Sequence, residues 1–567
     1  MNQMKISITS IPQIYRNIKR WREILSVLSK YGLADWLSRV NIDFVKDQLK
    51  APDGEALARQ SHETRIRLAL TELGPTFVKL GQLLSTRADI VGVKLADELT
   101  KLQSDVRADP FDKIREIVET ELGLPVKELF TEFEETPIAS ASIGQVHRAR
   151  LQSGEQVVVK VQHAKIEKTI QNDLDLIGGI AQLAERFDEF KPYRPVSLAA
   201  EMARTLRREL DFGREERNLQ QFDAMFSKDP TVRVPKPISE LCTSRVLTME
   251  FLDGLKLGER KQLLAAGFDL EEIAQRGAGL YLKMIFKHGF YHADPHPGNI
   301  VLLPGNVIGL LDFGMVGRIN ERLREDIEEM LSSIVNSDVP MLTTIIKRIG
   351  AVPFDLDEGA LANDVADFVG IYAGQALNQF DVSGALRDMT EMMRRHNITL
   401  PTDAAMLIQV LAKLEGTGKM LSPTFSLMEV MQPFHRTQIM RRLSPLRQAR
   451  KMRRIYLELE KMAEVLPQRF MSILDQIQSG KFDVHLDHRG LGPSVNRLVL
   501  GMLTSAMFLG SAQMLSLKVK PMLFPVNEFL GLHQLSIMGL AGCTLSIVLG
   551  LRLVWAIRKS GHLDKKD

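Results

Sequence analysis

The stretch GFYHADPHPGNIVLLPGNVIGLLDFG, residues 289–314, decides the fold. Apolar residues on both sides of the turn at Pro304–Asn306 predict a β-hairpin. Asp294 and Asn299 precede this hairpin, and Asp312 follows it. Because a hairpin returns the chain to the end where it began, we expect these three polar side chains to lie close together.

The spacing of the three residues is typical of phosphoryl-transfer sites. Asp294 and Asn299 have the D-x-x-x-x-N spacing of a kinase catalytic loop, and Asp312 begins a D-F-G sequence. In this chemistry one carboxylate positions or deprotonates the nucleophile, while an amide oxygen and a second carboxylate hold Mg²⁺. Each residue alone is more often an ordinary turn residue, but the ordered set is specific. We therefore expect Asp294 to be catalytic and Asn299 and Asp312 to be metal ligands.

A lysine lies in a strand-like segment upstream of this stretch. Residues 145–162 contain two such runs around Ser153–Gly154, which predicts another hairpin. In the second run Lys160 shares a face with Val158. A lysine among apolar residues is costly unless it is paired or binds an anion. The pattern is similar to the V-A-I-K strand whose lysine holds nucleotide phosphates.

His292 and His296 allow a second interpretation. The sequence H-x-D-x-H could supply three metal ligands. No other cluster of histidine and carboxylate completes such a site in the sequence, so we favour histidine as an orienting residue of the catalytic loop.

Composition narrows the class of protein. The 567 residues are 45% hydrophobic and 25% charged, which is typical of two to four globular domains and excludes a disordered or low-complexity chain. The formal net charge of +3 does not indicate a nucleic-acid-binding protein. Two distant cysteines, Cys242 and Cys543, indicate a reducing compartment rather than a disulfide framework.

The N-terminal segment is basic but has no uninterrupted apolar run. A secretory signal is therefore not expected, whereas a transit peptide stays an alternative. Trp21, Ile24 and Leu25 share one face at helical spacing, and we favour a first helix there.

The C-terminal segment is apolar. The runs Leu498–Leu517 and Leu535–Leu551 contain no charged residue, and they are long enough to predict a transmembrane hairpin. Small residues four apart, such as Ala506 and Gly510 or Gly542 and Ser546, would let the two helices approach closely. The alternative is a buried hairpin of a soluble protein. Basic residues flank the hairpin and favour both of its ends on the cytoplasmic side.

The sequence HADPHPGN, residues 292–299, resembles the catalytic loop of the UbiB family of atypical protein-kinase-like proteins. The K-x-G-Q motif of that family matches Lys79 to Gln82, in a helix expected after Gly74–Pro75. Without the resemblance, Lys79 and Gln82 would be interpreted as part of an exposed polar stripe of the helix. The resemblance implies instead that the helix covers the active site and that Lys79 and Gln82 gate access to it.

Two further motifs carry the resemblance. The first replaces the glycine-rich loop of kinases by alanine and serine, which in the family is associated with unusual nucleotide preference and suppressed kinase activity; its candidate nucleotide-binding residues are Ala139, Ser140, Ala141, Ser142 and Gly144. The second is an E-x-D motif beginning at Glu209. Glu209 is our candidate partner for Lys160, although Lys79 could compete for the same carboxylate.

The segment between the lobes reads as a strand leading into a hinge. Met249 and Phe251 would line the adenine pocket there, although an ordinary core strand fits the letters equally well. After Gly317 no A-P-E motif follows, and helical patterns run from Glu321 to about Arg469. Docking of a protein substrate is therefore not expected.

The sequence thus predicts an α+β, two-lobed protein-kinase-like fold. We expect an N-terminal helical extension over residues 1–110, a first lobe over 111–252, a largely helical second lobe over 253–490 and a transmembrane hairpin over 495–558.

The resemblance implies a Mg²⁺-dependent ATPase that supports biosynthesis of ubiquinone or a related isoprenoid quinone, with ATP or ADP and Mg²⁺ as cofactors. The alternatives are a lipid or small-molecule kinase and a nucleotide-binding pseudokinase scaffold. The implied partners are membrane lipids, quinone precursors and quinone-biosynthesis enzymes, without nucleic acid; a homo-oligomer stays open. The implied location is a bacterial inner membrane with the catalytic body in the cytoplasm.

Overall fold

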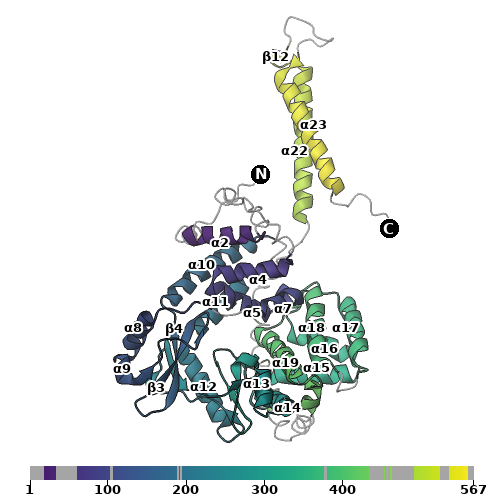
Figure 1. Cartoon of the computed structure of the whole chain (residues 1–567). Helices are drawn as coiled ribbons and strands as arrows, with labels where there is room; N and C mark the ends of the chain where they lie inside the picture. Colours follow the sequence, from purple (N-terminus) through teal and green to yellow (C-terminus); the bar gives the residue numbers. More distant parts are fainter. Residues whose placement is uncertain are drawn as a thin grey trace. The chain divides into compact units, whose positions relative to one another are not determined.

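The computed structural model describes residues 18–33, 60–102, 106–187, 191, 194–375, 380–432, 491–523 and 535–559, with a few single residues between 452 and 471. The chain forms two compact units, residues 1–444 and residues 445–567. The first unit is a mostly helical α+β body, as predicted (Figure 1). The predicted boundaries after residues 110 and 252 lie within this unit and stay predictions.

Helices form the N-terminal part of the described chain: α2 (Ile18–Lys30), α4 (His62–Leu73), α5 (Pro75–Ser85), α6 (Ala88–Val91) and α7 (Val93–Leu99). The apolar face of α2, with Trp21 and Ile24 buried, packs against α4 and α10. Gly74 has a φ of 97° and Pro75 is the first residue of α5, so the chain turns sharply between α4 and α5. The helix expected to carry the K-x-G-Q motif is thereby confirmed.

The first lobe contains a five-stranded antiparallel sheet in the order β1-β3-β4-β6, with β2 paired to β3. Its strands are β1 (Phe130–Phe133), β2 (Ala139–Ser140), β3 (Gly144–Leu151), β4 (Gln156–Gln162) and β6 (Val246–Glu250). The helices of this part are α8 (Phe111–Leu122), α9 (Val126–Leu129), α10 (Ile166–Ala184), α11 (Pro195–Glu209) and α12 (Phe212–Phe226).

Strand β4 separates two hydrophobic cores. Val157, Val159 and Val161 are buried in the core that contains residues of α8. Val158 points to the other face and joins the core that continues into the second lobe. Because side chains alternate along a strand, Lys160 faces the same way as Val158, as predicted. The lysine therefore lies on the side of the sheet that faces the second lobe.

The second lobe combines short strands with helices. A four-stranded sheet has the order β5-β10-β9-β7, and β8 pairs with β11. The strands are β5 (Val232–Arg233), β7 (Leu255–Lys256), β8 (Phe290–His292), β9 (Ile300–Leu303), β10 (Val307–Leu310) and β11 (Val316–Arg318). The helices are α13 (Arg260–Ala265), α14 (Leu270–Leu282), α15 (Glu321–Val335), α16 (Val339–Ile349), α17 (Glu358–Tyr372), α18 (Val382–Arg395) and α19 (Thr402–Leu421).

The β-hairpin predicted around the turn at Pro304–Asn306 is confirmed. Strands β9 and β10 are antiparallel, with Leu303 opposite Val307 and Ile300 opposite Leu310. The predicted helical run after Glu321 is confirmed as far as α19, whereas most of its continuation toward Arg469 lies outside the described residues.

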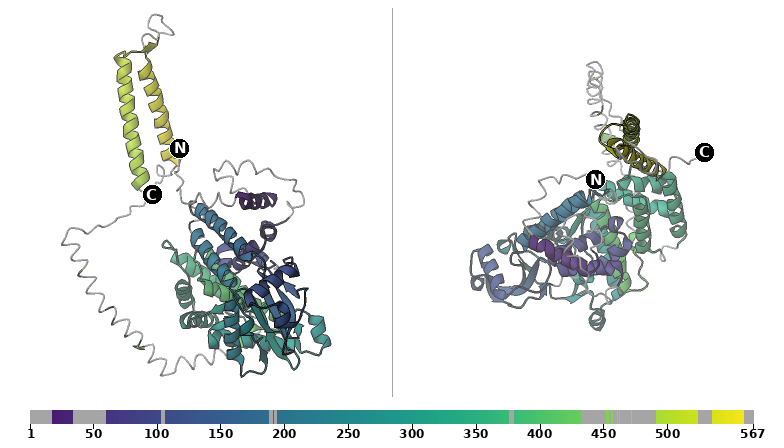
Figure 2. Two further views of the ribbon diagram at one scale, coloured as in Figure 1. Left: turned by 90° about the vertical axis from the view of Figure 1, so that its left-hand side faces the viewer. Right: turned by 90° about the horizontal axis from the view of Figure 1, so that it is seen from above.

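The second unit is a pair of long apolar helices, α22 (Leu491–Ser516) and α23 (Ile537–Lys559), joined through the short strands β12 (Met522–Leu523) and β13 (Leu535–Ser536). The two helices lie side by side (Figure 2). Gly542 packs against Ser511 so closely that a side chain would not fit, which confirms part of the predicted small-residue contact. Gly510, in contrast, faces open space.

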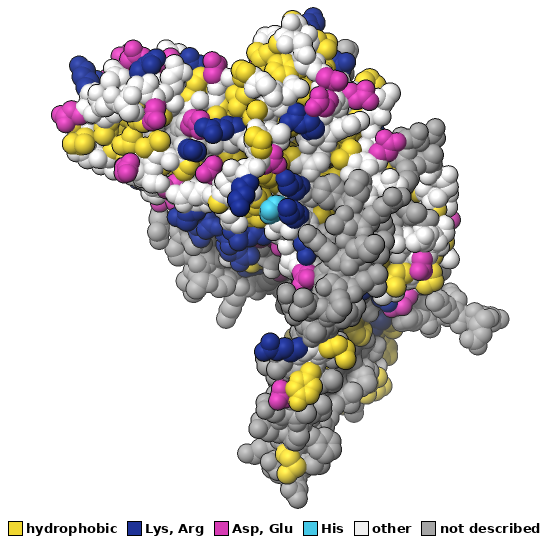
Figure 3. Space-filling model, turned by 90° about the horizontal axis from the view of Figure 1, so that it is seen from below, with side chains coloured by type: hydrophobic (Ala, Val, Ile, Leu, Met, Phe, Trp, Pro, Cys, Tyr) yellow, Lys and Arg dark blue, Asp and Glu magenta, His cyan; other side chains and the backbone are white. Residues whose placement is uncertain are grey.

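Both helices are long and apolar enough to cross a membrane, over Asn496–Ser516 and Ile537–Trp555. The flanking basic residues at 488–489 and 565–566 lie outside the described residues. Acidic and basic side chains both occur on the face of the molecule drawn in Figure 3, in keeping with the small net charge.

Candidate active site

Lys160 is held by a buried glutamate. Its Nζ atom donates to both carboxylate oxygens of Glu215, at 2.9 and 2.8 Å. The Glu215 side chain is only 4% exposed, and this burial raises its pKa. Burial alone would lower the pKa of Lys160, but Asp312 and Glu215 outweigh it and hold that pKa above its ordinary value. The charge of each residue of the pair is therefore stabilised by the charge of the other.

The prediction that Glu209 pairs with Lys160 was wrong. Glu209 lies 2.6 Å from Lys79, measured from Oε2 to Nζ, and not on Lys160. The reason is that Glu209 is the last residue of α11, whereas Glu215 lies in the first turns of the next helix, α12. The competition that the sequence left open is thus resolved in favour of Lys79.

Helix α12 is capped at its N-terminus and contacts the D-F-G sequence further along. Asp211 caps its N-terminus by accepting a hydrogen bond from the Gly213 N–H at 3.0 Å. Asn218 donates to the Phe313 carbonyl at 3.0 Å. The rings of Phe222 and Phe313 pack with their centroids 5.0 Å apart. Helix α12 therefore couples Glu215 to the position of the D-F-G sequence.

Asp312 faces the same lysine from the second lobe. Its Oδ1 atom lies 3.4 Å from Lys160 Nζ and accepts a hydrogen bond from the Gly314 N–H at 3.2 Å. Its φ of 53° is uncommon for a residue other than glycine. Lys160, and more weakly Lys79, lower the pKa of Asp312, so the carboxylate is ionised. The carboxylate is also half exposed, with 54% of the side chain accessible, so it can contact a ligand.

The catalytic-loop residues meet beside Asp312, as the hairpin predicts. Asn299 donates from Nδ2 to Asp294 Oδ2 at 2.8 Å. The Asn299 carbonyl accepts from the Leu311 N–H at 2.8 Å, which places it next to the start of the D-F-G sequence. Since the amide nitrogen of Asn299 is used by Asp294, its amide oxygen is the atom left for a metal ion.

The two histidines serve the backbone of this loop. His292 is fully buried, and its Nε2 atom lies 2.9 Å from the carbonyl oxygens of both Leu311 and Asp312. Its Nδ1 atom accepts from the Asp294 N–H at 3.2 Å. His296 Nδ1 accepts from the Gly298 N–H. This geometry matches the orienting role, and among the described residues no three His, Cys, Asp or Glu side chains are grouped as a transition-metal site requires.

The K-x-G-Q helix reaches the same group of charged residues. Lys79 of α5 pairs with Glu209, and it lies near enough to Asp312 and Lys160 to interact with their charges. Gln82 donates from Nε2 to the Leu102 carbonyl at 3.2 Å. Helix α5 therefore brings a second lysine into the site.

The alanine-rich loop between β2 and β3 is tied down. The Ala141 N–H donates to the Gly144 carbonyl, and His163 bonds to the carbonyls of Ala141 and Ile143. Gly144 lacks a side chain for a packing reason, because a Cβ atom there would collide with the backbone of Val161. The hydroxyl groups of Ser140 and Ser142 are buried and have no hydrogen-bond partner among the described residues.

The face of the sheet that carries Lys160 is otherwise apolar. Val146 and Met249 join the same core as Val158, and the register pairs Val158 with Met249. Phe251 is partly buried, and the Arg148 guanidinium lies 4.4 Å from its ring centroid. An apolar wall next to a lysine fits the base and phosphates of a nucleotide, and the Asn299 and Asp312 oxygens fit Mg²⁺.

Comparisons with known proteins show the family. Residues 101–345 match the model of the ABC1 atypical kinase-like domain, residues 365–426 that of the UbiB helical domain, and residues 485–559 that of the ABC1/UbiB kinase-like C-terminal domain. An uncharacterised protein of Synechocystis, sll1770, is 32% identical over 422 residues, which are 74% of this chain and 71% of that protein. The chain belongs to the ABC1/UbiB atypical kinase-like family.

Two further relatives extend the comparison. An uncharacterised protein encoded in the 5′ region of hydrogenase 1 in Clostridium pasteurianum is 29% identical over 554 residues, 96% of this chain and 100% of that protein. The chloroplastic protein Activity of BC1 complex kinase 7 of Arabidopsis thaliana is 35% identical over 377 residues, 66% of this chain and 54% of that protein.

The UbiB helical domain supplies one residue of the site that the sequence did not indicate. Lys413 of α19 donates to Asp294 Oδ1 at 2.9 Å. Thr417, one turn further along, donates to the Pro295 carbonyl at 3.2 Å. Lys413 lies 119 residues after Asp294 and belongs to no motif, so no signal in the chain links the two.

Glu215 was also missed, but a signal for it exists. Phe212, Glu215, Leu219, Phe222 and Phe226 share the buried face of α12. A glutamate within such an apolar stripe is costly unless it is paired, which is the argument that pointed to Lys160. When one glutamate and one lysine each lie within a separate apolar pattern, the two are expected to pair with each other.

Proposed function

We propose that this member of the family is a Mg²⁺-dependent ATPase that supports biosynthesis of ubiquinone or a related isoprenoid quinone at a membrane. The observation that carries the proposal is the meeting of Glu215 and Lys160 with Asp312 of the second lobe, beside Asp294 and Asn299. Charges from three separate elements converge there, and such convergence is typical of functional sites.

Each residue has a task that follows from its position. Lys160, held by Glu215, presents its ammonium group to phosphate oxygens. Asn299 and Asp312 offer oxygen ligands on the opposite wall. Asp294, held by Asn299 and Lys413, orients the attacking oxygen. When bound, ATP would supply the transferable phosphoryl group and Mg²⁺ would neutralise its charge.

Lys79 and Gln82 act as a gate in this proposal. Helix α5 carries Lys79, and the Lys79–Glu209 pair lies next to Lys160 and Asp312. We propose that this helix covers the site where a peptide substrate of a protein kinase would otherwise lie. With no A-P-E motif after Gly317, a water molecule or a small acceptor suits the site better than a protein.

The membrane part of the proposal rests on α22 and α23. Isoprenoid precursors carry long apolar tails and stay in the bilayer, so an enzyme that acts on them or on their modifying enzymes gains from a membrane hairpin. We propose a bacterial inner membrane as the location, with the catalytic body in the cytoplasm and with membrane lipids, quinone precursors and quinone-biosynthesis enzymes as partners.

The experiment measures isoprenoid-quinone content in cells that lack the protein and carry either the wild-type chain or Asp312→Asn at matched expression. The amide keeps the size of the side chain but removes the charge that holds Mg²⁺. We expect quinone to fall to the level of the deletion. If only the deletion lowers quinone, the protein is a scaffold, and if neither does, the quinone role is wrong.

A lipid or small-molecule kinase is the second candidate, favoured by a cavity that adjoins the catalytic loop. It differs in its acceptor. Radiolabelled phosphate transferred from ATP to a component of a membrane extract, absent with Asp312→Asn, would support it over the ATPase.

A further inference from the structure

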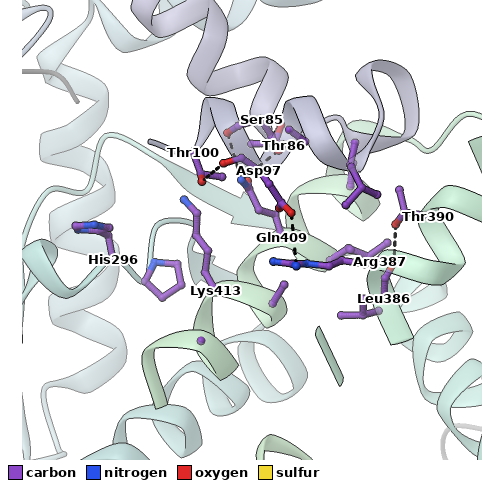
Figure 4. A pocket seen from close by; sticks show the side chains of 18 of the residues that line it. Ser85, Thr86, Asp97, Thr100, His296, Leu386, Arg387, Thr390, Gln409 and Lys413 are labelled. Atoms are coloured by element: carbon purple, nitrogen blue, oxygen red, sulfur yellow. Dashed lines mark hydrogen bonds and ion pairs between the residues drawn. The ribbon is translucent and has the colours of Figure 1, made fainter. Parts of the chain in front are cut away.

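A cavity of about 460 Å³ lies between the K-x-G-Q region and the UbiB helical domain. Its walls come from α5, α6 and α7 on one side and from α18 and α19 on the other, with residues 295–297 of the catalytic loop at one end. Figure 4 shows Lys413 between His296 of this loop and Gln409. The volume is within the range of about 300–1,000 Å³ that small-molecule sites occupy.

The lining is largely apolar in character. Its apolar members include Val93, Ala96, Leu386, Leu400, Ile408 and Met420. The threonine hydroxyl groups of the lining donate to backbone carbonyls of their own or neighbouring segments, namely those of Leu83, Asp97, Leu386 and Pro295. A bound molecule would therefore meet mainly hydrocarbon over most of the cavity.

The charged residues that line the cavity differ in how they are paired. Asp89 is paired with Arg87, and Asp97 lies 3.5 Å from Arg387. Lys413 differs, because its carboxylate partner, Asp294, belongs to the catalytic loop and does not line the cavity. Its side chain is 32% exposed, and an ammonium group has three donors, so one oxygen on Asp294 does not use them all.

We propose that this cavity binds an amphipathic acid, with its apolar body between α5–α7 and α18–α19 and its anionic head group on Lys413. The proposal deepens the proposed function, on which its catalytic consequence rests: the head group shares Lys413 with Asp294 and so lies beside the residue that orients the attacking oxygen. The occupant then acts as an effector of ATP turnover.

The test of location uses dodecanoate that carries a diazirine at its apolar end, with the full-length chain in a non-ionic detergent and without ATP. Light-induced labels are mapped by mass spectrometry. We expect labels on α5–α7, α18 or α19, in addition to any on the apolar helices α22 and α23. Labels confined to α22 and α23 would overturn the proposal.

Gly416→Leu provides the filling variant. Gly416 lines the cavity within α19, and open space surrounds the position of its missing Cβ atom, so leucine fills the cavity without a clash and favours the helix. Gly370→Leu in α17 is the matched control, since Gly370 also faces open space but does not line the cavity. Labelling should fall at least about tenfold in Gly416→Leu only; equal labelling in both variants contradicts the site.

The head group is tested by competition with unlabelled dodecanoate, dodecan-1-ol, dodecyltrimethylammonium and acetate. Dodecanoate should compete best, and Lys413→Gln should weaken it about tenfold, to the level of dodecan-1-ol. Dodecyltrimethylammonium competing as well as dodecanoate would refute the acidic head group. Because labelling needs no nucleotide, these results stand apart from ATP turnover: labelling without turnover refutes only the proposed function, and turnover without cavity labelling refutes only this site.

Discussion

The ion pair between Lys160 and Glu215 is the most demanding contact at the scale of single residues. Both side chains are removed from water, at 15% and 4% exposure, so each charge depends on the other. Losing one partner of such a pair typically costs about 3–5 kcal/mol because the remaining charge stays buried. The pair therefore fixes where the lysine ammonium points.

Glu215→Gln is expected to lower ATP turnover about 100-fold, because a neutral amide no longer holds the ammonium group in place. Turnover under saturating Mg²⁺ and ATP, with thermal unfolding as a check on folding, measures this. Glu216→Gln is the matched control on the same helix, where the side chain contacts Gln220. Equal turnover in the two variants would contradict the assignment of Glu215.

At this scale the sequence predicted residues better than it predicted contacts. Asp294, Asn299 and Asp312 come together because one tight hairpin joins them, and a hairpin is a local feature. Lys160 and Glu215 are 55 residues apart, so only their matching burial could link them. Lys413 reaches Asp294 through tertiary packing of α19, which no local pattern encodes.

At the scale of elements, the start of α12 decides how Glu215 is presented. Asp211→Ala removes the cap of α12 and should destabilise the helix by about 1 kcal/mol. Asp211→Asn keeps a capping oxygen and should retain stability and ATP turnover. Thermal unfolding and turnover of both variants measure this, and an Asn variant as impaired as the Ala variant would mean that the charge of Asp211, and not its cap, matters.

Helices α4 and α7, which support the cavity wall, are joined through Glu98. Hydrogen bonds from Lys101 and Arg67 lower the pKa of Glu98 to about 2. Because the folded pKa is below the ordinary value of 4.5, the stabilisation is complete above pH 4.5 and is lost as the pH falls toward 2. Solvent screening limits its size to the order of 1 kcal/mol.

Amide hydrogen exchange of α4 and α7 tests this pH dependence. Glu98→Gln should exchange faster than the wild type at pH 7, and the two should converge as the pH approaches 2. A difference that persists unchanged at low pH would show that the carboxylate charge is not the cause.

Elements whose ends are marked by local chemistry were predicted well. Gly74–Pro75 marks the start of α5, and the turn at residues 304–306 sets the β9–β10 hairpin. Gly144 stays a candidate nucleotide-binding residue, and the structure adds a packing reason for the glycine against Val161. The close approach of two strands is a property of the sheet, so the local sequence could not reveal it.

At the scale of the whole molecule, the apolar exteriors of α22 and α23 predict a bilayer-embedded unit. Leu509 and Val548 are 68% and 61% exposed, which is costly in water. Leu509→Arg with Val548→Arg should release the chain from carbonate-washed membranes, since each arginine costs about 2.5–3.5 kcal/mol in a spanning helix. Leu264→Arg, at an exposed leucine of α13, is the control and should stay bound. Membrane retention of the double variant would contradict a spanning hairpin.

The overall plan was predictable because its parts have strong and separate signals. A phosphoryl-transfer motif, a strand lysine and two apolar runs of membrane length each stand out in the sequence, and the α+β body and paired C-terminal helices are confirmed. The cavity was not predictable, because its walls come from segments about 300 residues apart along the chain.

The most direct measurement of the central claim is Mg²⁺-dependent ATP hydrolysis by the purified full-length chain, compared between the wild type, Asp312→Asn and the surface control Asp112→Asn, whose side chain is 84% exposed. Hydrolysis should require Mg²⁺, fall at least about 100-fold in Asp312→Asn and stay unchanged in the control. Hydrolysis by Asp312→Asn at the wild-type rate, or none by a wild-type chain that still binds nucleotide, would contradict the ATPase.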